Sequence, residues 1–184
     1  YTEDLFANTG KIDYNVRVQS IPNKGSYCGE LLNKLTVVQG RLPQNKKECV
    51  VLQNAVQERG FPIGGKLQLV PATKEEKLKD TFAVTEFEIV GVVTSSTYIH
   101  MDLGSTNIGD GTLNSIVYVS DDAFDMDVYT EAYLQMDGSK EYTSYTDEYN
   151  TQVEIFQDKV KNGTVKILNE RFDDVIQENR DKLK

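Results

Sequence analysis

Alternating apolar and polar residues mark the first clear strand of the chain. Ile12, Tyr14, Val16 and Val18 alternate with polar residues, so their side chains share one face of a half-buried strand that ends before Pro22. Residues 1–10 are polar and predict no clear element. Similar patterns predict further strands at 35–39, 49–52, 66–70, 82–84, 87–93, 116–119 and 129–136.

Glycines and helical spacing complete the expected fold. Gly91, inside a predicted strand, indicates a bulge or a close approach of two backbones. A short helix is predicted from Asn54 to Gly60, where Gln57 completes a capping box. One helical turn is predicted at 121–124. From residue 142 apolar residues recur every three or four positions, which predicts a helix, a break at Asn162-Gly163 and a second helix.

The expected fold class is α+β. A β-rich lobe of mixed and antiparallel strands with one short helix is followed by C-terminal helices. At 184 residues, of which 39% are hydrophobic, the chain can form one domain or two small lobes. The net charge of −9 argues against nucleic acid and anionic membranes as direct partners. The chain has no apolar run of membrane-spanning length and no signal peptide, and its start at Tyr1 suggests a fragment or a processed product.

The two cysteines allow two interpretations. Cys28 and Cys49 are too few for a disulfide framework, but they could form one bridge in an oxidising compartment. The alternative, two reduced and partly buried thiols, is favoured.

Three groups of residues are candidates for chemical sites. His100 is the only histidine and has no accompanying zinc-ligand pattern or nucleophile motif, so a surface role is favoured over catalysis. The glycine-rich loop 104–111 lacks the following helix and the basic residue of a phosphate-binding loop. The acidic residues Asp121, Asp122, Asp125 and Asp127 lack the ligand spacing and glycine of a calcium loop.

Two other motifs have structural explanations. Tyr142, Tyr145 and Tyr149 share one face of the predicted helix, where packing on the sheet is expected rather than ligand binding. Asn162-Gly163-Thr164 fits a glycosylation sequon, which has meaning only in a secretory eukaryotic context. The sequence therefore predicts no catalytic, cofactor-binding or metal-binding residue.

The chain resembles the extracytoplasmic domain of FtsX-like ABC-transporter permeases, the group that contains MacB. The main matching segments are Val38-Gln39-Gly40-Arg41-Leu42-Pro43, Glu48-Cys49-Val50-Val51-Leu52, Ile63-Gly64-Gly65-Lys66 and Phe87-Glu88-Ile89-Val90-Gly91-Val92-Val93. Weaker matches are Tyr98-Ile99, Gly104-Ser105, Tyr118-Val119, Tyr129-Thr130-Glu131 and, in the tail, Glu170-Arg171-Phe172-Asp173. The resemblance covers residues 35–160, and the start of the chain departs from it.

The resemblance implies an organisation and a function. Residues 1–40 and 138–184 would form a small membrane-proximal α/β lobe with a helical tail, and residues 41–137 an inserted β-rich lobe. The domain would be non-catalytic, with no cofactor, outside the bacterial cell membrane. It would transmit movement driven by a separate cytoplasmic ATPase during export, lipoprotein release or peptide resistance. Its expected partners are that ATPase, through the parent transmembrane helices, a second permease copy, and an accessory protein or exported substrate.

Two alternatives belong to other classes. The chain could be a secreted or surface-anchored binding or adhesion module, which would have no flanking transmembrane spans. An enzyme would need two carboxylates that converge in a pocket with different pKa values.

Overall fold

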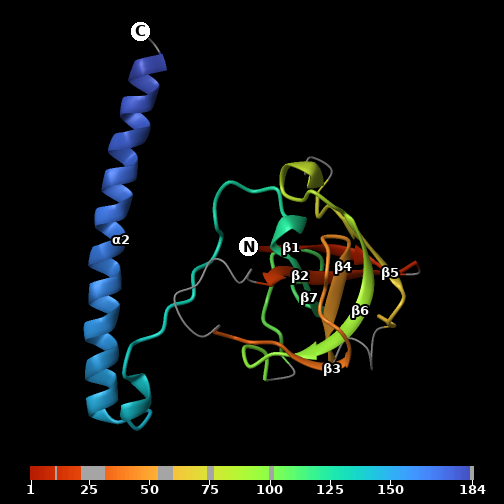
Figure 1. Ribbon diagram of the computed structural model, residues 1–184, viewed down its shortest axis with the longest axis horizontal. Helices are drawn as coiled ribbons and strands as arrows, with labels where there is room; N and C mark the ends of the chain where they lie inside the picture. Colours follow the sequence, from red (N-terminus) through yellow and green to blue (C-terminus); the bar gives the residue numbers. More distant parts are fainter. Residues whose placement is uncertain (11, 22–31, 54–59, 74–76, 100–101, 183–184) are drawn as a thin grey trace. The chain divides into compact units, whose positions relative to one another are not determined.

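The chain folds into two compact units, residues 1–133 and residues 134–184. The computed structural model describes residues 1–10, 12–21, 32–53, 60–73, 77–99 and 102–182. The first unit is built from strands and the second from one long helix (Figure 1). The predicted α+β class is therefore confirmed at this level.

Six strands of the first unit close into a barrel. The described residues of this unit form seven strands in all, which are β1 (Thr2–Asn8), β2 (Asp13–Ile21), β3 (Thr36–Gly40), β4 (Glu48–Leu52), β5 (Lys66–Val70), β6 (Glu86–Thr94) and β7 (Ser115–Ser120). Their order is β3-β6-β4-β7-β2-β1-β5, and β5 also pairs with β6. The sheet is mixed, because β2 runs parallel to β7 and β4 runs parallel to β6. β3 lies outside the closed ring and pairs with β6.

Apolar side chains pack on both faces of part of the barrel. The inner cluster contains alternate residues of the strands, such as Val16 and Val18 of β2. A second cluster lies on the outer face of β4, β6 and β7, where Leu103 and Leu113 of the connection before β7 cover it. Since these three strands are buried on both faces, they are continuous apolar runs in the sequence, whereas β2 alternates.

The barrel depends on a close backbone contact at β6. β6 pairs with β5 through Glu86–Glu88 and with β3 from Gly91 to Thr94, so its partner changes along its length. A Cβ atom on Gly91 would collide with the backbone oxygen of Arg41, and one on Gly40, at φ +75°, with that of Val90. The pairing of β6 with β4 also shifts register beside Gly91. The predicted bulge and close approach are both confirmed.

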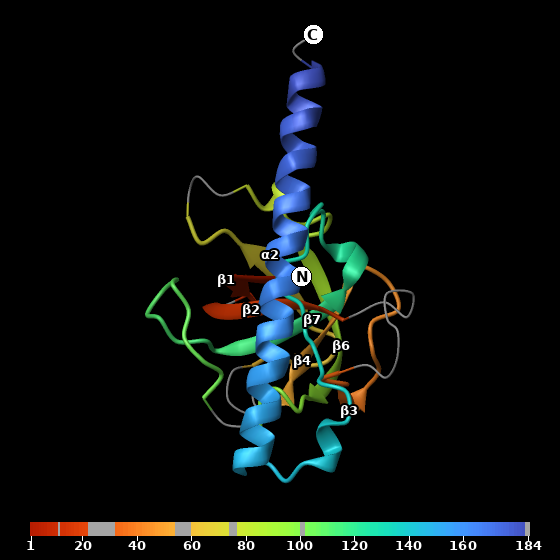
Figure 2. The same ribbon diagram turned by 90° about the vertical axis from the view of Figure 1, so that its left-hand side faces the viewer.

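The second unit contains α2 (Asp147–Lys182), a continuous helix of 36 residues. Figures 1 and 2 show it as one uninterrupted helix, so the predicted break at Asn162-Gly163 is wrong. The apolar stripe rotates at this point, which explains the mistaken boundary. Before it lie half-buried residues such as Phe156, and after it exposed ones such as Leu168 and Phe172. Within the described residues, no helix combines the length and apolar character that crossing a membrane requires.

Several other predictions differ from the structure. Residues 2–8 form β1, although no element was predicted there. The sequence pattern missed this strand because only two of its side chains, Leu5 and Ala7, lie in the core. The strand predicted at 129–136 is absent, and of 82–84 only Phe82 forms an isolated bridge, with Phe124. The strands at 35–39, 49–52, 66–70, 87–93 and 116–119 and the turn at 121–124 are confirmed within two residues. Most of the helix predicted at 54–60 lies outside the described residues.

The compact units divide the chain between residues 133 and 134. β1, β2 and β3 belong to the same sheet as the strands of residues 48–120. The assignment of a membrane-proximal and an inserted lobe stays a prediction.

Gly91→Ala is expected to destabilise the barrel. The added methyl group meets backbone rather than a movable side chain, so the expected loss in the free energy of unfolding is about 1–3 kcal/mol. Urea unfolding followed by near-ultraviolet circular dichroism measures it. An unfolding midpoint equal to that of the unchanged protein would refute the close contact.

Gly163→Ala is expected to stabilise α2 by about 0.5–1 kcal/mol, because glycine costs this amount inside a helix. Apart from the neighbouring backbone of the helix itself, no atom lies within 4 Å of the position that the new Cβ would occupy. Thermal unfolding followed at 222 nm tests this. If residue 163 instead ended a helix in the left-handed conformation, alanine would lower the helical signal and the midpoint.

Candidate functional site

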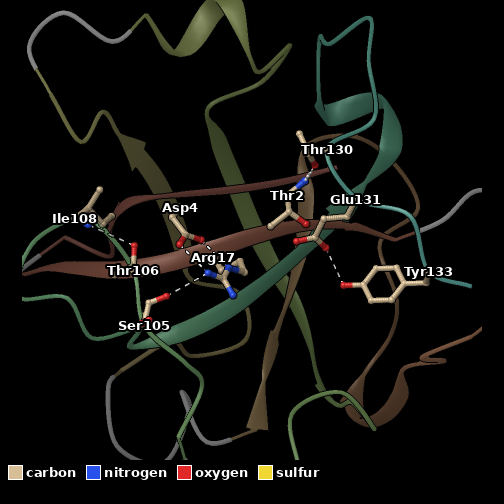
Figure 3. A network of polar contacts seen from close by, with 9 residues as sticks. All are labelled: Thr2, Asp4, Arg17, Ser105, Thr106, Ile108, Thr130, Glu131 and Tyr133. Atoms are coloured by element: carbon tan, nitrogen blue, oxygen red, sulfur yellow. Dashed lines mark hydrogen bonds and ion pairs between the residues drawn. The ribbon is translucent and has the colours of Figure 1, made fainter. Parts of the chain in front are cut away.

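Polar side chains gather on the outer face of β1 and β2 (Figure 3). Asp4 and Arg17 are directly opposite each other in the two strands. The guanidinium of Arg17 donates from Nε to Oδ1 of Asp4 at 2.7 Å and from Nη2 to Oδ2 at 2.8 Å. Nη2 also reaches the backbone oxygen of Ser105 at 3.4 Å. The pair therefore joins two neighbouring strands and contacts the connection before β7.

The charges of this cluster are already satisfied by protein groups. The hydrogen bond to Asp4 is the largest cause that raises the pKa of Arg17, and burial opposes it. Burial raises the pKa of Tyr98, although its contact with Arg17 acts in the opposite direction. Burial and the 2.8 Å hydrogen bond to Glu131 raise the pKa of Tyr133 to about 12. These tyrosines stay protonated at neutral pH, so they hydrogen-bond but do not act as bases.

Residues near the end of the first unit contact the start of β1. The backbone N–H of Thr2 donates to Oγ1 of Thr130 at 2.7 Å (Figure 3). Tyr1 stacks between Phe124 and Tyr129, with ring centroids 5.3 Å and 5.0 Å away. These contacts hold residues 124–133, which form no strand, against the start of β1.

Several backbone amides of the glycine-rich loop 104–111 bind within the loop and its flanks. Gly111 N donates to the backbone oxygen of Ile108, and Thr106 N to that of Gly111. Gly104 N donates to the carboxylate of Asp102. A phosphate-binding loop needs such amides free to face the ligand. The loop is instead a closed turn.

Asn15 of β2 fastens this loop to the barrel. Its side-chain nitrogen donates to Oδ1 of Asp110 at 2.8 Å and to the backbone oxygen of Thr112 at 3.0 Å. Its backbone N–H donates to the side chain of Asn114 at 2.9 Å. A Cβ on Gly109, at φ +56°, would collide with the Asn15 side chain, so a larger residue there would displace the loop. Sequence analysis missed Asn15 and Arg17 as contact residues, although both occupy polar positions of the alternating strand.

The acidic residues near β7 do not form a metal site. Asp121 and Asp122 open the 3₁₀ helix η2 (Asp121–Ala123), and the N–H of Asp125 donates to the backbone oxygen of Thr81. Among the described residues, which include Asp127, no group of three or more His, Cys, Asp or Glu side chains could hold a metal ion.

The remaining candidates are the two cysteines, His100 and the glycosylation sequon. Cys49 is a free thiol inside the barrel, and burial raises its pKa, which makes it unreactive. Cys28 and His100 lie outside the described residues. The sequon at residues 162–164 lies within α2, where the Thr164 hydroxyl donates to the backbone oxygen of Val160.

The three tyrosines do not form a strip along one helix. Tyr142 and Tyr145 precede α2, and Tyr149 is half-buried on its first turn. Tyr145 has φ 67° and is 91% exposed, so it does not pack on a sheet. The predicted common helical face is therefore wrong.

The segments that carry the family resemblance meet along β6. Three backbone hydrogen bonds link them: Arg41 N to Val90 O (3.1 Å), Gly64 N to Ile89 O (2.8 Å) and Ile89 N to Gly65 O (2.9 Å). The segment 48–52 pairs with β6 as strand β4. Gly40 and Gly91 make the close contact described above. The order and spacing of these short motifs therefore satisfy one structural requirement, which is to pack three chain segments around residues 88–91.

An ion pair closes the loop between β3 and β4. Arg41 binds both carboxylate oxygens of Glu48, with Nη2 2.9 Å from Oε1. The Gln44 N–H and the Asn45 side chain donate to the same carboxylate. The Arg41 hydrogen bond, followed by that from Gln44, lowers the pKa of Glu48 to about 2. The carboxylate therefore holds a loop and has no proton to donate at neutral pH.

No family model, no curated protein and no solved structure matches this chain. The family resemblance therefore stays a hypothesis based on its motifs.

Arg41→Met is expected to lower the stability of the first unit at neutral pH and to change its dependence on pH. Because the folded-state pKa of Glu48 lies below its ordinary value of 4.5, its contribution is present above pH 4.5 and lost as the pH falls toward 2. The hydrogen bond from Arg41 is the main cause of this low pKa. Removing it should lower Tm at pH 7 and reduce the further decrease of Tm between pH 4.5 and pH 2.

Thermal unfolding of Arg41→Met at pH 7, 4.5 and 2.5 measures both effects. Lys66→Met is the control, since it removes a cation from the more exposed pair with Glu86. Equal behaviour of the two variants would contradict the structural role of Arg41.

Proposed function

We propose that the chain is a non-catalytic extracytoplasmic domain of an FtsX-like ABC-transporter permease. It transmits ATP-driven movement and contacts a substrate or an accessory protein during export, lipoprotein release or peptide resistance. The observation that supports the proposal is the convergence of the motif segments on residues 88–91 of β6. A chance resemblance is less expected for four short motifs that pack together in the structure than for four motifs that lie apart.

The mechanical role is supported by the kind of elements present. A closed barrel has no free strand edges within its ring and resists deformation. A helix of 36 residues is about 54 Å long and can carry a displacement over that distance. In this role the ATPase acts through transmembrane helices of the parent protein, and a second permease copy completes the transporter in the bacterial cell membrane.

Two properties of the parent protein test the proposal: the sequence that flanks this segment, and the accessibility of a cysteine in this domain to a reagent outside the cell. Apolar spans of about 20 residues should flank the segment. In the parent protein, Tyr145→Cys places a thiol at a fully accessible position, while Cys49 stays buried. A membrane-impermeant maleimide should label this variant in intact cells, and the protein should sediment with membranes. The parent with Tyr145 unchanged gives the background from the native cysteines.

Two outcomes would contradict the proposal. Labelling that requires cell lysis would place the domain inside the cell. A parent without apolar spans that is recovered from the medium would identify a secreted binding or adhesion module instead.

A further inference from the structure

The second half of α2 carries an exposed apolar face. Four large apolar side chains form it, and all are exposed: Val165, Leu168, Phe172 and Val175. Their spacing of three, four and three residues places them within about 80° of the helix circumference. An exposed apolar stripe bounded by polar residues marks an interaction surface.

The same line of the helix continues into charged residues. Asp158 and Lys161 precede Val165 at spacings of three and four residues, so they lie on its side of the helix, and both are exposed. In a parallel pair of helices in register, each residue of this line faces its own copy. Two aspartates and two lysines would then face each other at core positions, which disfavours parallel pairing of two copies.

An antiparallel pair of α2 helices centred on residue 170 has complementary apolar faces. It places Val165 of one copy opposite Val175 of the other, and Leu168 opposite Phe172. The spacing of three, four and three residues is the same in both directions, which makes this match possible. The four apolar side chains of one copy are then covered by the same four of the second copy.

The charges along the helix favour the same arrangement. Residues 159–169 contain three lysines and no acidic residue, whereas residues 171–181 contain four acidic residues and two arginines. Antiparallel pairing centred on residue 170 brings these two segments beside each other twice, and parallel pairing would bring each beside its like. One like-charge contact opposes it, because Arg171 of each copy lies near the two-fold axis.

We propose that α2 binds α2 of a second copy of the chain as an antiparallel pair through Val165, Leu168, Phe172 and Val175. The pairing depends on the helix alone, but its use between two permease copies rests on the proposed function. A two-fold axis that relates two copies in one membrane lies along the membrane normal. The axis of an antiparallel pair is perpendicular to both helices, so in a transporter the paired helices would lie along the membrane surface.

Disulfide cross-linking of the whole chain tests the direction of pairing. Val165→Cys and Val175→Cys are each made together with Cys28→Ser, and Cys49 is buried. Under mild oxidation a mixture of the two variants should form a cross-linked dimer, and either variant alone should form at least tenfold less. The reason is that two copies of residue 165 lie about 15 Å apart along an antiparallel pair. Parallel pairing would give the opposite result.

Sedimentation equilibrium of the whole chain tests the residues involved. A weak dimer is expected, because each copy contributes only four apolar side chains, so the measurement extends to about 0.5 mM chain. About 0.15 M salt screens the repulsion between two acidic chains. Phe172→Glu should weaken association at least tenfold. Ile167→Glu is the matched control, since Ile167 is also 65% exposed but lies on another side of α2, and it should leave association unchanged.

Three outcomes would overturn the proposal. They are a monomer at the highest concentration, a cross-link of Val165→Cys alone that equals or exceeds that of the mixture, and equal weakening by Phe172→Glu and Ile167→Glu. Circular dichroism at 222 nm verifies that both variants keep the helix. A monomeric chain would not change the labelling of the parent protein in intact cells, and a parent without transmembrane spans would not change the pairing. The two proposals therefore fail separately.

Discussion

The close contact between Gly40 and Gly91 is the constraint on which the first unit depends. β6 must pair with β4 along one side, and with first β5 and then β3 along the other. β6 changes its partner from β5 to β3 at the point where the backbones of residues 40–41 and 90–91 approach each other closely. Side chains at Gly40 and Gly91 would prevent this approach. The pairing of β5 with β6 closes the ring of six strands, and the contact at Gly91 places β3 beside β6 outside that ring. The exposed edge of β3 is therefore a consequence of the way in which the barrel closes.

The polar contacts of the first unit follow from the same arrangement. The ion pair of Arg41 with Glu48 holds the loop that leaves the glycine contact, and Asn15 and Arg17 hold the connection that covers the outer core. The side-chain nitrogens of Asn15, Arg17 and Arg41 that make these contacts donate to protein oxygens. Such saturated contacts stabilise loops and are poor sites for acid–base chemistry or ligand binding.

Local patterns were enough to locate most strands, but not their pairing. The run around β6 and the alternation in β2 placed these strands within two residues, and Gly91 correctly indicated a close backbone contact. β1 was missed because its two core residues are separated by a half-buried aromatic, Phe6. The boundary expected in α2 was wrong because a rotation of the apolar stripe resembles a helix end. Closure through β5 and the contacts of Asn15 join residues far apart in sequence, so no local pattern could predict them.

Hydrogen exchange at β6 and its contacts tests the central claim most directly. The amides of Arg41 and Gly64 lie outside the strands, yet they donate to backbone oxygens of β6, and the amides of Glu88 and Ile89 in β6 donate to the backbone oxygens of Lys47 and Gly65. If the barrel depends on these contacts, the exchange of the four amides should be as slow as that of the β4 and β7 amides and should accelerate together with them in denaturant. Fast exchange of Arg41 and Gly64 under native conditions, with β4 and β7 protected, would show that the barrel does not depend on this contact.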